Sequence, residues 1–471
     1  MDATSDPVAL SPGIAQNLVN LLTERRGLLR GQMQVTNLAL SSFTAGIDGL
    51  GYLYAQNVTF SNSSTSTSPL AARLVVVSNG SVNSYPLISP PTFPPTFNVG
   101  GLVTSGGLIT GQKARMVAFG QEMYIVQEAN AYSNYRMLYS GVIVSHGILA
   151  PQASDWTAVT QTPSVGPSVK SGTVQYNITF YDSLGRETSP CLTPKTIAYG
   201  SSPSVDGKIT VNFSAYTAPR DVQGANVYAT TPGGTLFYFI GAVAVTGGNV
   251  EDNIADVSVG GAAQIAPNFG ENDAPKPASL IAVHKNRVIL NQTGSSRIQI
   301  SNDGSATQFN SQGYKFDQAT LLISNPSDGI TLSLGTDQGD SPTAMMSFGS
   351  LFLVWKRRSI YVLYGNDLTD FEVKPVHNSK GCIAPDSAVR CDNEIFFLAD
   401  DGVYALTSSL QCEKISKPIE SLLAPLRLSL TGRAQMETAQ GWFVQNEYNL
   451  AINDTIYVFN FDVKQWSIRQ F

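Results

Sequence analysis

The sequence predicts an all-β fold: a β-propeller with an inserted immunoglobulin- or fibronectin-III-like β-sandwich, preceded by a short N-terminal helical arm. Three observations predict it. Short apolar runs separated by tight turns recur along most of the 471 residues, one internal block has a strand pattern of its own, and one helical period lies near the N-terminus. Radially repeated four-stranded sheets account for so many apolar strands better than one pair of sheets does.

The helical arm is expected within residues 1–35. Ser11 and Pro12 are typical of a helix start, because proline is well tolerated in the first helical turn. From there residues 14–29 follow a rough 3.6-residue period in leucine. The leucines on this period are Leu18, Leu21, Leu22 and Leu29. We therefore expect one short amphipathic helix here.

The propeller is expected in two parts, residues 36–160 and 275–471. Each repeat reads as an inner strand, a tight turn, an apolar strand, and an outer strand that carries Tyr or Arg. These units cover residues 72–82, 115–139, 280–301, 345–364, 388–406 and 441–468. Their irregular spacing excludes a regular WD40-type repeat, and five or six blades are expected. A helix is expected over residues 417–428, between the last two blades.

Residues 165–268 are expected to form the inserted sandwich. Some seven short strands in a block of about 100 residues are typical of immunoglobulin-like folds. The flanking segments, residues 161–167 and 260–277, are rich in Pro, Ser and Gly, as linkers into an inserted domain usually are.

The composition favours assembly and argues against tight nucleic-acid binding. Charged residues make up 14% of the chain, below the roughly 25% usual in soluble proteins, and the net charge is −6. A protein that neutralises DNA phosphates needs Lys and Arg, which this balance disfavours. A pore through which DNA slides without binding remains compatible. Few charges also mean little repulsion between neighbouring copies.

No cofactor or metal site is predicted. The four cysteines, Cys191, Cys382, Cys391 and Cys412, show no C-x-x-C spacing, and the three histidines lie far apart, so a zinc site is not expected. We expect the cysteines to be reduced core residues of a protein made in the cytosol. The N-terminus lacks the regions of a signal peptide, and no stretch reaches 18 apolar residues.

Propellers can host glycosidases, and three features of the sequence bear on that chemistry. Residues 301–309 resemble the Asp-box of sialidases, but the glycine is one residue early and Phe309 replaces Trp. Sialidase chemistry uses an arginine cluster and a tyrosine nucleophile, whereas Arg357, Arg358 and Tyr361 are too close on one strand to form that pocket. Acidic pairs are possible glycosidase carboxylates or calcium ligands, although each lies beside turn residues, where Asp caps the backbone. These pairs are Asp337/Asp340, Asp367/Asp370 and Asp400/Asp401.

Neither His284 nor His377 has a recognisable nucleophile partner, and the chain has no phosphate-binding loop or dinucleotide fingerprint. No catalytic residue is therefore named, and the chain is expected not to be an enzyme.

The most distinctive run is residues 380–406, which begins Lys-Gly-Cys-Ile-Ala-Pro-Asp-Ser and contains Asp-Asp-Gly-Val-Tyr; an Ile-Ser follows at residues 415–416. It is expected to form most of one blade. The run resembles a segment of bacteriophage tail proteins of the nozzle and packaged-DNA-stabilisation type. Residues 282–309 and the sandwich motif Tyr-x-x-x-Phe-x-Asp-x-x-Gly-x-Glu at residues 176–187 are similar to further segments of these proteins.

The resemblance implies a structural virion protein in the tail of a short-tailed phage, synthesised in the host cytoplasm. Propeller subunits of this family form a hexameric ring below the adaptor ring of the head-to-tail connector, next to needle or fibre proteins. Genomic DNA passes through the lumen without specific binding, and no membrane insertion is implied. The ring helps to retain the packaged genome, and whether this chain is nozzle or genome plug stays open.

Two alternatives of other classes also stay open. One is a receptor- or carbohydrate-binding tail module, with the sandwich as its binding domain. Exposed aromatic side chains would favour that function, although the same residues are equally good core residues. The candidates are Tyr228, Phe237, Tyr238 and Phe239. The other alternative is a propeller glycosidase.

Overall fold

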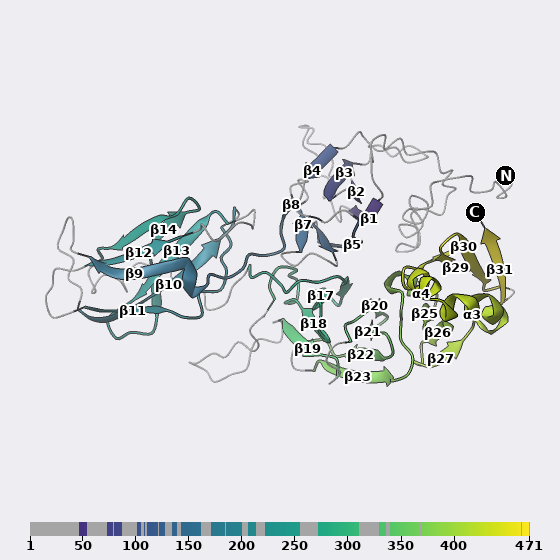
Figure 1. Ribbon diagram of the computed structural model, residues 1–471. Helices are drawn as coiled ribbons and strands as arrows, with labels where there is room; N and C mark the ends of the chain where they lie inside the picture. The colour runs from purple at the N-terminus through teal and green to yellow at the C-terminus, as the bar shows by residue number, and fades with distance from the viewer. Residues whose placement is uncertain are drawn as a thin grey trace, which may run out of the picture. The chain divides into compact units, whose positions relative to one another are not determined.

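The computed structural model (Figure 1) describes most of the chain from residue 47 onward. The described residues are 47–53, 73–78, 80–86, 101–104, 108, 111–120, 122–127, 134–138, 143–161, 171–183, 185–199, 206–212, 222–254, 272–309, 329–335, 340–367, 370–462 and 464–470. The helical arm expected in residues 1–35 lies outside them.

The chain divides into two compact units, which correspond to the propeller and to its insertion. The first unit takes in the described residues of Met1–Ile143, Lys276–Asp303 and Thr331–Phe471. The second takes in those of Val144–Pro275 and Gly304–Ile330.

The first unit is a six-bladed β-propeller, as expected, and each blade is a sheet of four strands that are consecutive in the sequence. The blades are β1 (Ile47–Leu53), β2 (Arg73–Ser78), β3 (Ser81–Pro86) and β4 (Gly101–Thr104); β5 (Ala114–Phe119), β6 (Glu122–Gln127), β7 (Tyr135–Met137) and β8 (Ile143–Ser145); β16 (Ile281–His284), β17 (Arg287–Asn291), β18 (Arg297–Ile300) and β19 (Ile330–Ser333); β20 (Ala344–Phe348), β21 (Leu351–Trp355), β22 (Ile360–Tyr364) and β23 (Glu372–His377); β24 (Val389–Cys391), β25 (Glu394–Ala399), β26 (Gly402–Thr407) and β27 (Cys412–Lys414); and β28 (Gln440–Val444), β29 (Glu447–Ile452), β30 (Thr455–Asn460) and β31 (Gln465–Gln470).

The blades follow one another around a ring (Figure 1). The innermost strands β1 and β5, β5 and β16, β16 and β20, and β24 and β28 lie side by side. Shared cores join the fourth blade to the fifth and the fifth to the sixth. A middle strand is thus covered on both faces, which explains why β21, β25 and β29 are nearly continuous apolar runs rather than alternating ones.

The outermost strands of the first five blades lie outside the units predicted from the sequence, whereas β31 of the last blade was predicted. β23, for example, contains Glu372, Lys374 and Pro375 and has no buried residue. An outer strand pairs on one side only and faces water, so its sequence need not be apolar. The strand signal of such a segment is correspondingly weak.

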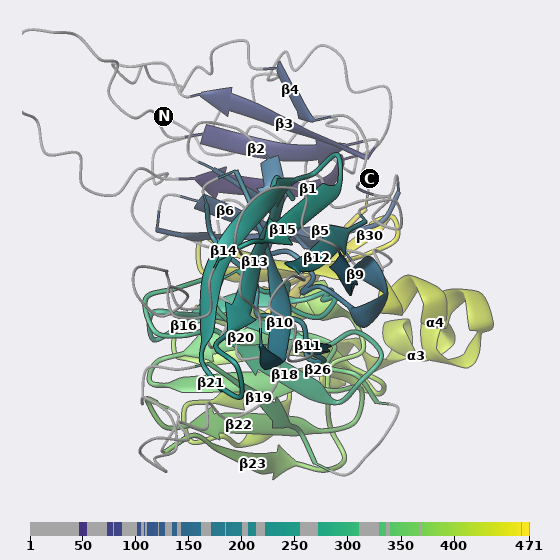
Figure 2. The same ribbon diagram turned by 90° about the vertical axis from the view of Figure 1, so that its left-hand side faces the viewer.

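The helix expected over residues 417–428 is present and is followed by a second one. The 3₁₀ turn η3 (Lys417–Ile419) leads into α3 (Glu420–Leu428), and α4 (Leu430–Glu437) then precedes the sixth blade. Ser429 caps α4, because its Oγ accepts a hydrogen bond from the Gly432 backbone N–H at 2.9 Å. Figure 2 shows the two helices standing out from the blades.

The second unit is a two-sheet β-sandwich of seven described strands, as expected. One sheet has the order β11-β10-β13-β14 and the other β15-β12-β9. The 3₁₀ turn η1 (Ala153–Asp155) precedes the first strand. The strands are β9 (Trp156–Gln161), β10 (Gly172–Tyr181), β11 (Lys195–Tyr199), β12 (Asp206–Val211), β13 (Gly224–Thr230), β14 (Phe237–Ala244) and β15 (Gly248–Asp252).

The sandwich begins earlier than the boundary expected at residue 165. β9 precedes that residue and pairs antiparallel with β12 along its whole length. Trp156, at the start of β9, is 1% exposed and belongs to the sandwich core. The Pro/Ser-rich segment taken as the entry linker therefore follows the first strand of the sandwich.

The sandwich motif at residues 176–187 has a structural role in this unit. Tyr176 donates a hydrogen bond from its hydroxyl to the buried carboxylate of Asp252 at 2.6 Å. Asp182 closes the turn, accepting a hydrogen bond from the Arg186 backbone N–H at 3.0 Å and pairing with the Arg186 side chain at 2.6 Å. Glu187 accepts hydrogen bonds from Thr179 and Tyr228. The motif therefore forms a hairpin whose polar side chains contact one another and also Tyr228 and Asp252 of other strands.

Cys191, Cys382 and Cys391 are buried, Cys412 is half-buried, and all four are free thiols. Within the described ranges, no helix has the length and hydropathy needed to cross a membrane.

Candidate functional site

The candidate site is an ion cluster that links the second blade of the propeller to the fifth. Lys113 and Arg115 lie just before and within β5, the innermost strand of the second blade, and Asp386 lies just before β24, the innermost strand of the fifth. Arg115 donates from Nε and Nη2 to the two carboxylate oxygens of Asp386, each at 3.2 Å. Lys113 Nζ lies 2.5 Å from Asp386 Oδ2. Because the second and fifth of six blades are opposite, the cluster spans the propeller axis.

The cluster keeps its carboxylate ionised. Burial alone would raise the pKa of Asp386, but Arg115 and Lys113 together lower it to about 2. The third donor group of Arg115, Nη1, donates to the carbonyl oxygen of Ser279 at 2.9 Å, which ties the third blade to the same point. We call Lys113, Arg115 and Asp386 the axial cluster.

The loop that carries Asp386 is fastened to the fourth blade. At Gly381 the chain runs so close to the Lys356 carbonyl that a Cβ on Gly381 would overlap it. The Cys382 backbone N–H donates to the carbonyl oxygen of Lys356 at 2.9 Å. Thr343 donates from Oγ1 to the Cys382 carbonyl oxygen at 2.6 Å. These contacts fix where the loop enters the axis.

The same loop is fastened to the fifth and sixth blades at Ser387, the last residue of η2 (Pro385–Ser387). Ser387 Oγ donates to the Ala384 carbonyl oxygen at 2.7 Å and accepts from the Leu398 backbone N–H at 3.0 Å. The Ser387 carbonyl oxygen accepts a hydrogen bond from the Tyr448 hydroxyl of the sixth blade at 3.0 Å. The loop is therefore the point where three blades meet.

The later part of the distinctive run is explained by contacts within the fifth blade. Gly402 has φ +141° and lies against Ser416 Oγ, which leaves no room for a side chain. Ser416 Oγ accepts a hydrogen bond from the Val403 backbone N–H at 3.0 Å. The Tyr404 hydroxyl donates to Asp401 Oδ2 at 2.7 Å. The distinctive run therefore has a structural role here: its Asp-Gly-Val-Tyr residues and the later Ile-Ser pair contact one another within the sheet of the fifth blade.

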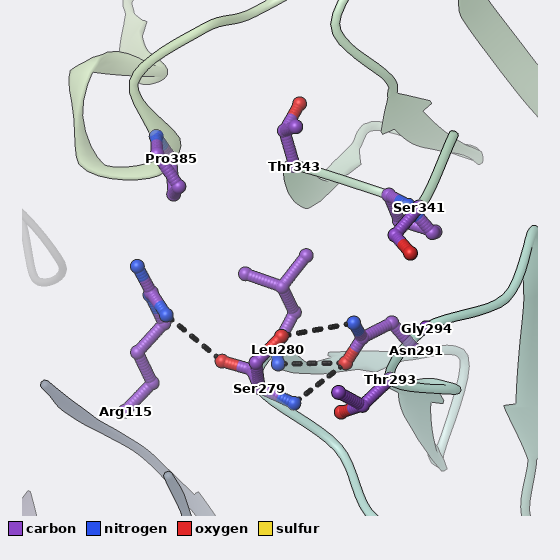
Figure 3. Close-up of a pocket in the computed structure, with 10 residues that line it drawn as sticks. Arg115, Ser279, Leu280, Asn291, Thr293, Gly294, Ser341, Thr343 and Pro385 are labelled. Carbon is purple, nitrogen blue, oxygen red and sulfur yellow. Dashed lines mark hydrogen bonds between the residues drawn. The ribbon is translucent and has the colours of Figure 1, made fainter. Parts of the chain in front are cut away.

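A cavity of about 260 Å³ lies beside the axial cluster (Figure 3). Arg115 points to its edge, and Asn291 holds the opposite wall by accepting hydrogen bonds from the backbone N–H groups of Ser279 and Leu280, both at 2.8 Å. Its lining residues are Arg115, Ser279, Leu280, Asn291, Thr293, Gly294, Ser341, Pro342, Thr343 and Pro385. This lining offers hydroxyl, amide and guanidinium groups, and it contains neither of the two carboxylates that a glycosidase mechanism needs.

The residues weighed for sialidase chemistry are not brought together as a pocket. Arg357 pairs with Asp400 at 3.2 Å and with Glu437 of α4 at 2.7 Å. Arg358 pairs with Asp400 at 3.6 Å and is largely exposed. Tyr361 is buried. In the Asp-box-like segment, Asp303 accepts a hydrogen bond from Asn286 in a surface turn at 2.9 Å.

The acidic pairs that are described act in turns and ion pairs. Asp370 Oδ1 accepts from the backbone N–H groups of Asn366 and Asp367 at 2.7 and 2.8 Å, which confirms the turn interpretation there. Asp401 pairs with Lys380 at 2.8 Å. Asp337 lies outside the described residues. Among those that are described, no group of three or more His, Cys, Asp and Glu side chains is placed to hold a metal ion.

The aromatic residues weighed for ligand binding in the sandwich are not fully exposed. Tyr228 is buried, and its ring packs edge-on against that of Phe239 with centroids 5.8 Å apart. Phe237, Tyr238 and Phe239 are half-buried along β14.

His284 is a buried titratable group between the third and fourth blades. Its Nδ1 lies 2.8 Å from Ser347 Oγ, and its ring lies against Phe352. Burial, and then the charge of Lys285, lower the pKa of His284 to about 4. The folded protein therefore holds this imidazole neutral at pH values where the unfolded chain protonates it.

This depressed pKa predicts a loss of stability in mild acid. The unfolded state binds the extra proton first, so the contribution of His284 is fully present above pH 6.5 and falls as the pH drops towards 4, by about 2–3 kcal/mol. Urea unfolding of the wild type and of His284→Gln, measured from pH 7.5 to 4.5, checks this. The variant should show a flatter pH dependence, and two parallel curves would contradict the prediction.

The axial cluster was not found from the sequence. Arg115 and Asp386 are 271 positions apart, and nothing local to either residue indicates the other. The only signal was indirect, since Asp386 lies inside the distinctive run 380–406.

Comparisons with known proteins find no related sequence and only distant structural likenesses. No protein-family model and no curated protein matches the sequence. Among solved structures, apo AztD from Citrobacter koseri is 9% identical, with 86% of this chain and 85% of that chain covered and a TM-score of 0.33. Hsv2 from Kluyveromyces lactis is 7% identical, with 85% and 94% covered and a TM-score of 0.28. PorZ, a surface component of the type-IX secretion system of Porphyromonas gingivalis, is 8% identical, with 85% and 37% covered and a TM-score of 0.27. AztD and Hsv2 are β-propeller proteins, but scores this low add nothing to the propeller and sandwich assigned above from the order of the strands.

Proposed function

We propose that this chain is a structural subunit of a short-tailed phage tail, a nozzle protein that assembles into a ring around the DNA-ejection channel and helps to retain the packaged genome. The observation that carries the proposal is the role of the segment that resembles nozzle proteins. Its loop joins three blades and sends Asp386 to the axial cluster, and its strands form the fifth blade. The shared residues thus serve the architecture of the propeller.

The charge of the chain supports the same function. In a ring built from heterologous contacts, each subunit packs closely against two neighbours, and low charge reduces repulsion between them. A net charge of −6 also disfavours retention of DNA through counterion release. The channel of the proposed ring lies between subunits, because the axial cluster bridges the axis of each propeller.

The test is the mass of the purified protein at virion-like concentration, with negative-stain images of the same sample. A closed ring of about six subunits with a central hole, as the resemblance implies, supports the proposal. A single species of monomer mass at all concentrations, which also fails to form rings with a purified adaptor ring, contradicts it. A glycan array and a hydrolysis assay on the same sample would then test the receptor-binding and glycosidase alternatives.

A further inference from the structure

Strand β14 lies at one border of the four-stranded sheet of the sandwich (Figure 1), and it is an apolar strand. Among the described strands, β13 is the one that pairs with it, so the opposite edge of β14 meets no described strand of its sheet. Residues 236–245, which are β14 and the residue at each end, contain no charged residue and no proline. Leu236 and Val245 are 56% and 45% exposed. An exposed apolar edge of this kind is a site where a further strand can add.

The other three border strands of the sandwich each involve a charged side chain. β9 and β11 lie beside each other, and Lys195 of β11 donates from Nζ to the carbonyl oxygens of Trp156 in β9 and of Ala153. β15 has the exposed Glu251 and, next to it, the buried carboxylate of Asp252. Charged side chains are one of the means by which proteins prevent edge-to-edge pairing. β14 is therefore the border strand of the described sandwich that lacks this protection.

A bulge divides β14 into two halves of different size. The register with β13 shifts between Val227 and Tyr228, which leaves Ile240 without an opposite residue. The half that ends at the bulge is bulky, and the half that follows it is small. In chain order, the residues are Leu236, Phe237, Tyr238, Phe239 and Ile240 in the first half and Gly241, Ala242, Val243, Ala244 and Val245 in the second. The strand is therefore complementary in size to a copy of itself that runs in the opposite direction.

An antiparallel pair of β14 strands, related by a two-fold axis at the bulge, places each bulky half against the small half of the other copy. The pairs that result are Leu236 with Val245, Phe237 with Ala244 and Phe239 with Ala242. Phe239 and Ala242 belong to the same face of the sheet, because their partners in β13 are two residues apart. Large side chains thus lie opposite small ones on one face of the joined sheet, an arrangement that packs well across paired strands.

We propose that β14 is a self-association edge, at which two copies of this chain pair their β14 strands antiparallel and join their sandwiches through one continuous sheet. The complementarity in size and the absence of charge favour a second copy over an unrelated strand. A single pair of strands buries little area, so the contact is weak and reversible. It is isologous and stops at two copies, whereas the proposed ring needs heterologous contacts, so the inference does not depend on the proposed function.

The first test is the mass of the full-length protein by sedimentation velocity over a range of concentrations. Wild type should show a reversible doubling of mass as the concentration rises. Ala242→Lys with Ala244→Lys, at two exposed positions of β14, should abolish the doubling, because lysines on an edge strand prevent pairing. The matched control, Thr157→Lys with Val159→Lys at two exposed positions of β9, should keep it. No doubling in wild type, or a doubling that survives the lysines in β14, would overturn the proposal. A ring that forms and is unchanged by those lysines would support the proposed function and overturn this inference alone.

The second test determines the register of the pair. Leu236→Cys and Val245→Cys are combined in a Cys412→Ser background, which removes the one native thiol that is not buried. The two new thiols lie about 30 Å apart along one strand, so they cannot bond within one chain. Oxidation should therefore give a cross-linked dimer on a non-reducing gel, and either cysteine alone in the same background should give none. A dimer from either single variant would assign the association to another contact and overturn the proposal, as would the absence of a dimer from the combined variant.

Discussion

Asp386→Asn is expected to lower the free energy of unfolding of the propeller by about 2–3 kcal/mol. The substitution keeps the shape of the side chain and removes its charge, so Lys113 and Arg115 are left facing each other at the axis without a counter-ion. Asp386 is 20% exposed and Arg115 16%, so water replaces little of the lost interaction. Urea unfolding at pH 7 measures the effect.

The matched control is Glu372→Gln, which breaks an ion pair of similar length on the surface. Glu372 and Lys374 are 2.8 Å apart but more than half exposed, and such pairs contribute little. We expect no measurable loss of stability there. If Asp386→Asn has no larger effect than Glu372→Gln, the axial cluster does not hold the blades together.

The fall in the free energy of unfolding at acid pH gives a second measurement of what the axial cluster contributes to stability. The pKa of Asp386 in the folded protein is about 2, below the usual value of 3.8 that applies to the unfolded chain. Its contribution is therefore complete above pH 4 and is lost as the pH falls towards 2. Wild type and Asp386→Asn should converge over this interval. Replacing all three members, with Lys113→Met, Arg115→Met and Asp386→Asn, should recover part of the loss at pH 7, because no unpaired charge then remains.

The sequence was enough to predict most strands of the fold, but it did not predict the axial cluster. Most inner and middle strands were predicted because each is an apolar run bounded by a turn, as in 351–356 for β21 and 449–452 for β29. The exception is β1, which contains Gly49 and Gly51 and was not predicted. Outer strands such as β23 were missed, because a strand that pairs on one side carries no such run. The start of the sandwich was misplaced, because β9 is mostly half-buried or exposed and merges with the linker pattern.

The axial cluster lay beyond prediction for a different reason. Its contacts exist only once six blades have closed and brought the second blade opposite the fifth. No local period of hydrophobicity or charge in the sequence encodes such a distance. What the sequence did contain was a distinctive run, 380–406, which includes Asp386.

Gly381→Ala is expected to lower the free energy of unfolding by more than about 3 kcal/mol or to abolish soluble protein. The backbone at Gly381 is not in the left-handed region, so conformational freedom is not the reason for the glycine. The reason is space: the new Cβ would overlap the Lys356 carbonyl oxygen and lie 2.6 Å from the Arg357 carbonyl carbon, and neither backbone atom can move without shifting β21 and its turn.

Gly349→Ala separates this cause from the ordinary cost of replacing a glycine. Gly349 has φ +61° and no atom near the position of a Cβ, so alanine there should cost about 1 kcal/mol through backbone strain alone. Soluble yield and urea unfolding of the two variants compare the two costs directly. A cost at Gly381 equal to that at Gly349 would mean that the loop can retreat from the fourth blade. Asp386 would then reach the axis without that contact, and the fastening at Ser387 and Tyr448 would be what positions it.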